Sequence, residues 1–176
     1  MKTRIFEKDE LDESTLDKIG EDIRNGALVI FPTETVYGIG ANAYDENASK
    51  RIFEAKGRPS DNPLIVHVNS LEMANICMKE NIVQYKNIIS KLWPGPITFI
   101  FKKSPSIPLT VTGGKNTVGI RFPSNKISQK IIQHSGVPIA APSANISGKP
   151  SSTRINHVIK DFLNRVDYII SDGDCF

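Results

Sequence analysis

The chain is 176 residues long, with 39% hydrophobic and 23% charged residues. This length suits one substantial hydrophobic core and is short for two ordinary domains, so we expect a single domain over residues 1–176. The formal net charge of +3 favours anionic partners such as nucleotides without requiring them. The sequence has no long apolar run, and its start is charged where a signal peptide is apolar, so we expect a cytoplasmic protein without a membrane segment.

The first predicted helix begins at Ser14, which can cap it, and ends at Gly26, because glycine tolerates the left-handed conformation there. Further helices are predicted at residues 46–55, 70–92 (in two pieces), 126–134 and 155–163. Strands are predicted at residues 27–32, 64–68, 97–101, 118–122 and 166–170, and just before "APSAN". Consecutive strands in the central part favour an α/β fold with a twisted, mixed parallel and antiparallel sheet and flanking helices.

The segment "KGRPSDNPLIVHV" combines a cationic, proline-rich turn with a predicted core strand. Pro59 disfavours helical geometry at Arg58, so we expect Lys56 and Arg58 to lie in extended backbone and to face the same way. Two converging cations suit an anionic ligand on a rigid loop. The alternative is a solvated charge pair that complements the dipole of the preceding helix.

His67 lies one residue before the end of the same predicted strand. Strand alternation places its side chain on the face opposite Leu64, Val66 and Val68. A lone histidine is more often a hydrogen-bonded structural residue than a catalyst, so its role depends on its neighbours.

The segment "FPTETVYGIGANA" contains Gly38, Gly40 and Ala43 in the spacing of a dinucleotide-binding loop. We reject that reading because five residues separate the strand from the glycines, and "YDE" delays the helix that would hold a pyrophosphate. What remains is a polar strand exit, which includes Thr33, above a flexible, glycine-rich floor. A simple turn is an equally good interpretation.

Two further segments carry polar groups near predicted strands. "APSANISGKPSS" offers small hydroxyl and amide groups that let a ligand approach the backbone, although an ordinary serine-rich loop would look the same. "NTVGIRFP" places Arg121 within a strand, where a buried arginine needs an anionic partner and an edge strand would instead leave it solvated.

Several patterns are missing from the sequence. It lacks a Walker phosphate-binding loop, a nucleophile elbow and a zinc-binding H-E-x-x-H motif. Its two cysteines, Cys77 and Cys175, fit no metal-ligand spacing and are too few for a secreted disulfide scaffold. The polar and cationic side chains therefore suit a phosphate-bearing ligand with a small carboxylate, and chemistry that depends on positioning and charge neutralisation.

Five segments occur in an order that resembles the YrdC family, whose best-known members are threonylcarbamoyl-adenylate synthases. They are "FPTETVYGIGANA", "KGRPSDNPLIVHV", "LWPGPITFIF", "TVGIRFP" and "APSANISGKPS", and the resemblance covers about residues 14–173. The family's K-x-R and S-x-N signature matches Lys56, Arg58, Ser143 and Asn145. The resemblance implies a sheet around a concave, basic cavity, and synthesis of L-threonylcarbamoyl-AMP from L-threonine, bicarbonate and ATP with release of pyrophosphate.

The same resemblance implies the roles of individual residues. Lys56 and Arg58 would neutralise charge on the phosphates during catalysis. The ATP-binding positions are Lys56, Arg58, Asn62, Thr117, Ser143, Asn145 and Ser151. The threonine-binding positions are Thr33, His67, Arg121 and Ala141, with the guanidinium of Arg121 suited to the carboxylate. Mg²⁺ would arrive with ATP and need no cage of protein ligands.

Partners and alternatives follow from the family as well. The threonylcarbamoyl group would reach tRNA directly or through a threonylcarbamoyl-transferase complex. An RNA-binding module that uses the basic cavity, or a family paralogue that handles another carbamoyl adenylate, remains open. Family members usually continue past "DYIISDGD" with a further strand, whereas this sequence stops at Phe176. We therefore also expect an exposed sheet edge near this point.

Overall fold

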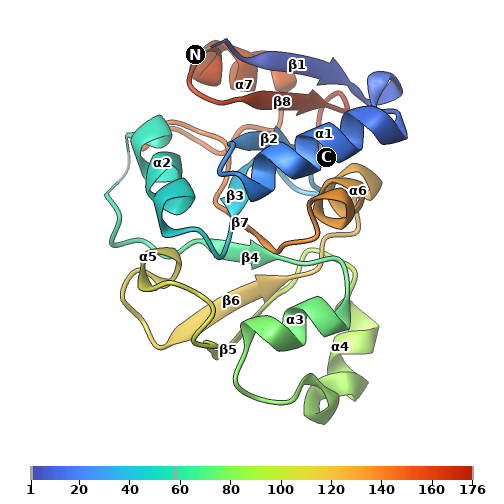
Figure 1. The fold of residues 1–176 in the computed structure, drawn as a ribbon, viewed down its shortest axis with the longest axis vertical. Coiled ribbons are helices and arrows are strands. Elements are labelled where there is room, and N and C mark those ends of the chain that lie inside the picture. Colours follow the sequence, from blue (N-terminus) through green and yellow to red (C-terminus); the bar gives the residue numbers. More distant parts are fainter. Residues whose placement is uncertain (1, 58, 176) are drawn as a thin grey trace.

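The computed structural model describes residues 2–57 and 59–175, and within them eight strands form one mixed sheet (Figure 1). The strands lie in the order β1, β8, β2, β3, β7, β4, β6, β5, with the parallel pairs β1/β8, β2/β8 and β4/β6 and with antiparallel pairing elsewhere. Their bounds are β1 (Arg4–Glu7), β2 (Val29–Phe31), β3 (Gly38–Asn42), β4 (Ile65–His67), β5 (Thr98–Lys102), β6 (Thr117–Arg121), β7 (Ile139–Ala141) and β8 (Tyr168–Ser171). The mixed sheet predicted from the sequence is confirmed.

Helices connect most of these strands. The α-helices are α1 (Glu13–Arg24), α2 (Glu46–Lys56), α3 (Leu71–Cys77), α4 (Lys86–Leu92), α5 (Leu109–Thr112), α6 (Lys126–Ser135) and α7 (Ile155–Phe162). Two short 3₁₀ helices are η1 (Lys8–Glu10) and η2 (Ile82–Tyr85). The sequence predicted the longer helices, but the predicted cap of α1 is wrong. Asp12 caps this helix, because its carboxylate accepts the amide hydrogen of Thr15 at 2.7 Å.

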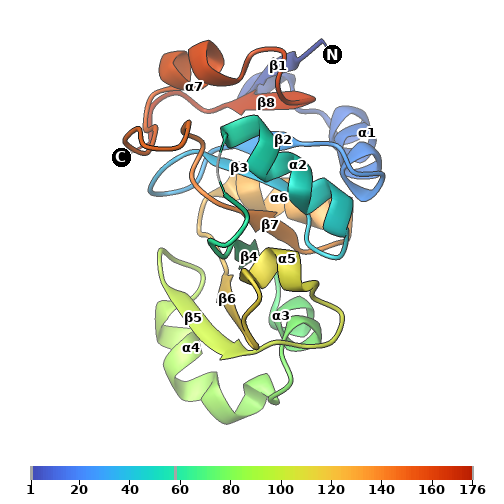
Figure 2. The ribbon, with the colours of Figure 1, turned by 90° about the vertical axis from the view of Figure 1, so that its left-hand side faces the viewer.

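Helices cover one face of the sheet over most of its width. The main core lies between this face and helices α2, α3, α4, α5 and α7, which supply side chains such as Ile52, Cys77 and Phe162. Figure 2 shows α2 and α5 on this side of β3 and β4, and α7 beside β8. The side chains of Val66 and Ile120 point into this core from β4 and β6.

The opposite face is covered only over part of the sheet. Helices α1 and α6 pack on β2, β7 and β8, where they bury Ile19, Ile131 and Ile139. Strand register carries the same face across to the neighbouring strands, because Ile139 pairs with His67 and His67 pairs with Arg121. On β4, β5 and β6 this face includes exposed or half-buried residues, so we call it the open face.

The glycine-rich segment after β2 is a strand and not the flexible floor that we expected. Strand β3 pairs with β2 on one side and with β7 on the other. A Cβ atom at Gly40 would lie 2.5 Å from Ile139 Cγ2 and 2.8 Å from a ring carbon of Phe31. Glycine is therefore required here because neighbouring side chains fill the space above the strand, and not because the backbone must be mobile.

Our expectation of an exposed sheet edge at the last strand is also wrong. Strand β8 lies between β1 and β2 and pairs with both. Strand β1 was not predicted from the sequence, because Arg4–Glu7 is short and mostly exposed. Among the described residues, no helix is both long enough and apolar enough to cross a membrane.

Candidate functional site

The open face brings two of the predicted threonine-binding residues next to each other. His67 ends β4 and Arg121 ends β6, and the two residues are register partners in these parallel strands. Both side chains are largely buried, at 4% and 9% exposure. Because parallel strands present their carboxyl ends at the same edge, the imidazole and the guanidinium lie side by side.

The loop after β2 reaches across to Arg121. The guanidinium Nη2 donates to Glu34 Oε1 at 2.5 Å and to Thr35 Oγ1 at 3.0 Å. The other oxygen of Glu34 accepts the backbone amide of Ser124 at 3.2 Å. Burial alone would raise the pKa of Glu34, but the hydrogen bonds, above all that from Arg121, outweigh burial and hold the pKa below its usual value.

Thr33 fixes the shape of this loop. Its hydroxyl donates to the carbonyl of Val36 at 2.6 Å and accepts the amides of Thr35 and Val36 at 3.2 Å. Such a side-chain turn replaces the missing backbone ladder. Thr33 is thus placed beside Arg121 through Thr35, and a role in binding threonine remains a prediction.

A second cluster joins two distant parts of the chain. Lys56 is 2% exposed, and its Nζ donates to the carbonyl oxygens of Ser143 and Asn145 at 2.5 Å each. Ser143 Oγ donates to Asn145 Oδ1, and the Asn145 amide donates to the carbonyls of Ile146 and Lys149. The lysine of the K-x-R motif therefore holds the S-x-N loop in place.

The backbone geometry predicted for Lys56 is wrong. Lys56 is the last residue of α2, and Gly57 ends this helix in the left-handed conformation with φ of 59°. Proline at 59 acts two residues too late to unwind Lys56. Arg58, the second predicted cation, lies outside the described residues. Contact of either side chain with phosphates remains a prediction.

The two clusters are linked through the start of β3. The amide of Ala144 donates to the carbonyl of Tyr37 at 2.7 Å, and Gly38 forms a β-bridge with Ser143. Tyr37 follows directly on the loop that holds Arg121. Hydrogen bonds and strand pairing thus connect the two loops, residues 33–36 and 143–145, with Lys56, His67 and Arg121. We treat these residues together as the candidate site.

His67 is an uncharged imidazole at neutral pH. Burial is the main reason that its pKa falls to about 4, and the neighbouring charge of Arg121 lowers it further. Nδ1 lies 3.1 Å from the carbonyl oxygen of Ile65, a contact that favours the tautomer with the proton on Nδ1. The ring meets Phe31 edge-on, with centroids 5.9 Å apart. Ala141 lies in the α1/α6 core at 1% exposure and pairs with Ile65 of β4, and its contact with threonine remains a prediction.

The remaining ATP-binding predictions are exposed residues at the margins. Thr117 is at the opposite end of β6 from Arg121, roughly 13 Å away along an extended strand. Asn62 is in the segment that packs against Gly113, where a Cβ atom would lie 2.5 Å from the carbonyl of Asp61. Ser151 precedes Ser152, whose carbonyl accepts the amide of Tyr37. Their contact with a nucleotide remains a prediction.

The sequence analysis treated the polar strand exit after β2 as a whole and gave Glu34, Thr35 and Tyr37 no individual role. The structure makes Tyr37 a link to the C-terminal segment: its hydroxyl donates to Gly173 O at 2.5 Å and accepts the amide of Asp172 at 3.2 Å. Burial raises the pKa of Tyr37 to about 12, so it remains a donor. The sequence signal was the tyrosine directly after a threonine-rich turn.

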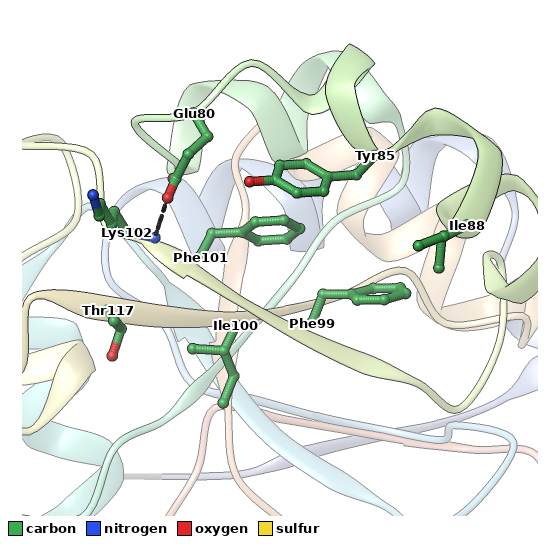
Figure 3. A pocket seen from close by; sticks show the side chains of 8 residues that line it. All are labelled: Glu80, Tyr85, Ile88, Phe99, Ile100, Phe101, Lys102 and Thr117. Carbon is green, nitrogen blue, oxygen red and sulfur yellow. Dashed lines mark hydrogen bonds between the residues drawn. The ribbon is translucent and has the colours of Figure 1, made fainter.

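A hollow of about 350 Å³ lies beside the edge strand β5, away from these clusters (Figure 3). Aromatic side chains on one side of the strand and Ile100 on the other line it. The Glu80 carboxylate accepts the backbone amide of Lys102 at 3.1 and 3.2 Å. Of the predicted ligand residues that the structure describes, only Thr117 lines this hollow.

Metal chemistry has no dedicated centre in residues 2–57 and 59–175. No three histidine, cysteine, aspartate or glutamate side chains of these residues gather closely enough to hold an ion. Glu34, the carboxylate nearest to Arg121, is already bonded to that guanidinium and to the amide of Ser124. Mg²⁺ bound mainly by phosphates and water would need no protein cage, so the donor set is compatible with it.

The fold and the two clusters define a class of protein. The chain belongs to the Sua5/YciO/YrdC family, since the family model Sua5_yciO_yrdC, described as "Telomere recombination", matches residues 21–176. It is 54% identical over 152 residues to the threonylcarbamoyl-AMP synthase of Pyrococcus abyssi, which covers 86% of this chain and 45% of that protein. It is 44% identical over 179 residues to the Bacillus subtilis threonylcarbamoyl-AMP synthase, covering 98% and 52%.

Solved structures agree with this assignment. The crystal structure of P. abyssi Sua5 complexed with L-threonine matches with a TM-score of 0.93 and 49% identity, over 98% of this chain and 51% of that chain. The crystal structure of E. coli YciO matches with a TM-score of 0.83 and 26% identity, over 99% and 86%. This chain therefore spans about half the length of the P. abyssi and B. subtilis relatives.

Proposed function

We propose that this chain synthesises L-threonylcarbamoyl-AMP from L-threonine, bicarbonate and ATP and releases pyrophosphate. This would be a nucleotidyl transfer and the first step of threonylcarbamoyladenosine formation in tRNA. The observation that carries the proposal is the contact of Lys56 with Ser143 and Asn145, which unites the two halves of the family signature. The names of the relatives and the threonine-bound P. abyssi structure support it.

The two clusters suit the two substrates. The Arg121 guanidinium can bind a carboxylate as a two-pronged donor, which fits L-threonine. The loop of residues 143–145 and Lys56 would face the phosphates of ATP, with Mg²⁺ held by phosphates and water. A carbamate formed from threonine and bicarbonate would then attack the α-phosphate, and the site would act by positioning and by stabilising charge.

The product would next be passed to tRNA, directly or through a threonylcarbamoyl-transferase complex. Such a role places the protein in the cytoplasm, where tRNA is available.

The test measures pyrophosphate release and the AMP-containing product. We expect pyrophosphate release from ATP only when L-threonine and bicarbonate are both present, with formation of a threonine-dependent AMP adduct. Parallel reactions that lack one substrate, or contain glycine in place of threonine, serve as controls. Pyrophosphate release that is independent of threonine, or binding of RNA with no response to ATP and threonine, would overturn the proposal.

A further inference from the structure

The pairing of Arg121 with Glu34 raises a question that the proposed function leaves open. Arg121 is proposed to bind the substrate carboxylate. In the structure, however, it already pairs with another carboxylate, that of Glu34, at 2.5 Å. The side chains of Arg121 and Glu34 are only 11% and 19% exposed. An ion pair this far removed from water is not screened as a surface pair is, so its charges cannot be ignored when a ligand arrives.

Arg121 is incompletely satisfied by Glu34. Its Nη2 has two acceptors, but its Nε is buried and has no hydrogen-bond partner within the described part of the chain. A buried donor without an acceptor is costly, and such groups in folded proteins call for an explanation. One carboxylate bound side-on can accept from Nε and an Nη of the same guanidinium. The guanidinium is thus set up for a better acceptor than Glu34.

A ligand that carried only a carboxylate would create a new problem. Once such a ligand bound Arg121, Glu34 would keep its hydrogen bond from the amide of Ser124 but would lose its cationic partner inside a partly buried site. An unpaired buried carboxylate costs far more than an exposed one, as the pKa of Glu34 reflects, since burial raises it and the Arg121 bond is what lowers it most. A ligand that also carried a cation beside its carboxylate would remove that cost.

We propose that Arg121 and Glu34 together form a receptor for the zwitterionic head group of a free α-amino acid. The substrate carboxylate takes Arg121, and the substrate ammonium group takes Glu34. Each protein charge exchanges its internal partner for the opposite charge of the ligand, so no charge is left unpaired. This inference rests on the proposed function for the identity of the amino acid, L-threonine, and assigns to Glu34 a role in specificity.

The surrounding loop supports such an exchange. The hydroxyl oxygen of Thr35 accepts a hydrogen bond from Arg121, and that of Thr33 accepts the amides of Thr35 and Val36. Glu34 therefore stands on a loop whose shape depends on short side-chain bonds rather than on strand pairing. The amide of Ser124 binds the second oxygen of Glu34, so this bond does not depend on the pairing with Arg121.

The experiment measures equilibrium binding by calorimetry for three ligands that differ only in the head group. L-Threonine carries both charges, (R)-3-hydroxybutanoate lacks the amine, and L-threoninol lacks the carboxylate. Each is titrated into the wild-type chain, Glu34→Gln and a control, Glu54→Gln, which changes an exposed carboxylate on α2. Circular dichroism and thermal melting establish that the variants are folded.

We expect Glu34→Gln to weaken L-threonine binding by about tenfold or more and to tighten (R)-3-hydroxybutanoate binding severalfold, because the amide needs no cation. L-Threoninol should lose affinity in this variant, and Glu54→Gln should match the wild type for every ligand. Tighter binding of both carboxylate ligands would overturn the proposal and make Glu34 a simple competitor for Arg121. Weaker binding of both would also overturn it and leave Glu34 as an orienting partner of Arg121.

Failure of the proposed function gives a different pattern. If the wild-type chain binds none of the three ligands at millimolar concentration, both the proposed function and this inference fall. If the wild type binds L-threonine and Glu34→Gln binds it equally well, only the inference falls.

Discussion

Lys56 is almost fully buried although its side chain carries a charge. A charged side chain at 2% exposure has given up water, and the carbonyls of Ser143 and Asn145 are among its compensating partners. It therefore braces the loop of residues 143–145, to which the family resemblance assigns ATP-binding positions.

We expect Lys56→Met to lower the free energy of unfolding by about 2–4 kcal/mol, because two buried carbonyls lose a charged donor. Urea denaturation measures this loss. The matched control is Lys50→Met on the same helix, where the ion pair with Glu46 at 2.8 Å is exposed and should contribute far less to stability. Equal stability of the two variants would contradict the bracing role.

His67 should make stability depend on pH. Its folded pKa is about 4 against an ordinary 6.5, so between these values the unfolded chain binds a proton that the folded chain does not. Its contribution to the free energy of unfolding is complete above pH 6.5 and declines by roughly 3 kcal/mol as the pH falls to 4.

The check compares urea denaturation of the wild type and His67→Asn at pH 7, 5.5 and 4. The wild type should lose more stability than the variant over this range, because asparagine does not titrate. Parallel pH profiles for the two proteins would show that His67 keeps an ordinary pKa.

The sequence predicted several site residues but not the way in which they meet. Alternation placed His67 opposite Val66, and the structure confirms that arrangement. Nothing in a local pattern could show that Glu34 would pair with Arg121, 87 positions away. Contacts between such distant residues depend on strand order, which side-chain periodicity does not encode.

At the scale of elements, helices α1 and α6 pack unusually closely at Gly20. A Cβ atom at this position would lie 2.3 Å from the carbonyl oxygen of His134. Helix propensity alone predicts that Gly20→Ala would stabilise the protein by up to about 1 kcal/mol. The contact predicts the opposite sign, because the two backbones would have to separate.

We expect Gly20→Ala to lower the free energy of unfolding by about 1–3 kcal/mol, measured by urea denaturation. Lys18→Ala, on the exposed side of the same helix, serves as the control and should leave the free energy of unfolding nearly unchanged. A stabilised Gly20→Ala protein would mean that α1 can shift away from α6 at no cost.

Elements with strong local signals were predicted better than those that depend on their neighbours. Helix α2 is preceded by Asp45, which accepts the amides of Asn47 and Ala48, and it ends at Gly57. Both are local signals. Strand β3 was missed because glycines are poor strand formers, and its pairing with β2 and β7 overrides that preference.

At the scale of the whole molecule, the candidate site collects its parts from nearly the entire chain. Thr33 to Tyr37 come from the first quarter, Lys56 and His67 from the second, and Arg121 and Asn145 from the later half. His67 and Arg121 meet on the open face, which exists because α1 and α6 cover only the other part of that side of the sheet, whereas Lys56 comes from α2 on the covered face. The fold class was readable from the order of strands and helices, whereas this partial coverage was not.

The outer edge of β5 has a consequence for handling the protein. The amide of Lys102 points outward to Glu80, and the backbone of Ile100, two residues earlier, points the same way, with its side chain 73% exposed. Such an edge can seed intermolecular aggregation, which the charges of Glu80 and Lys102 oppose. Concentrated salt would screen both charges, so dilute salt is the condition under which we expect concentrated stocks to stay clear.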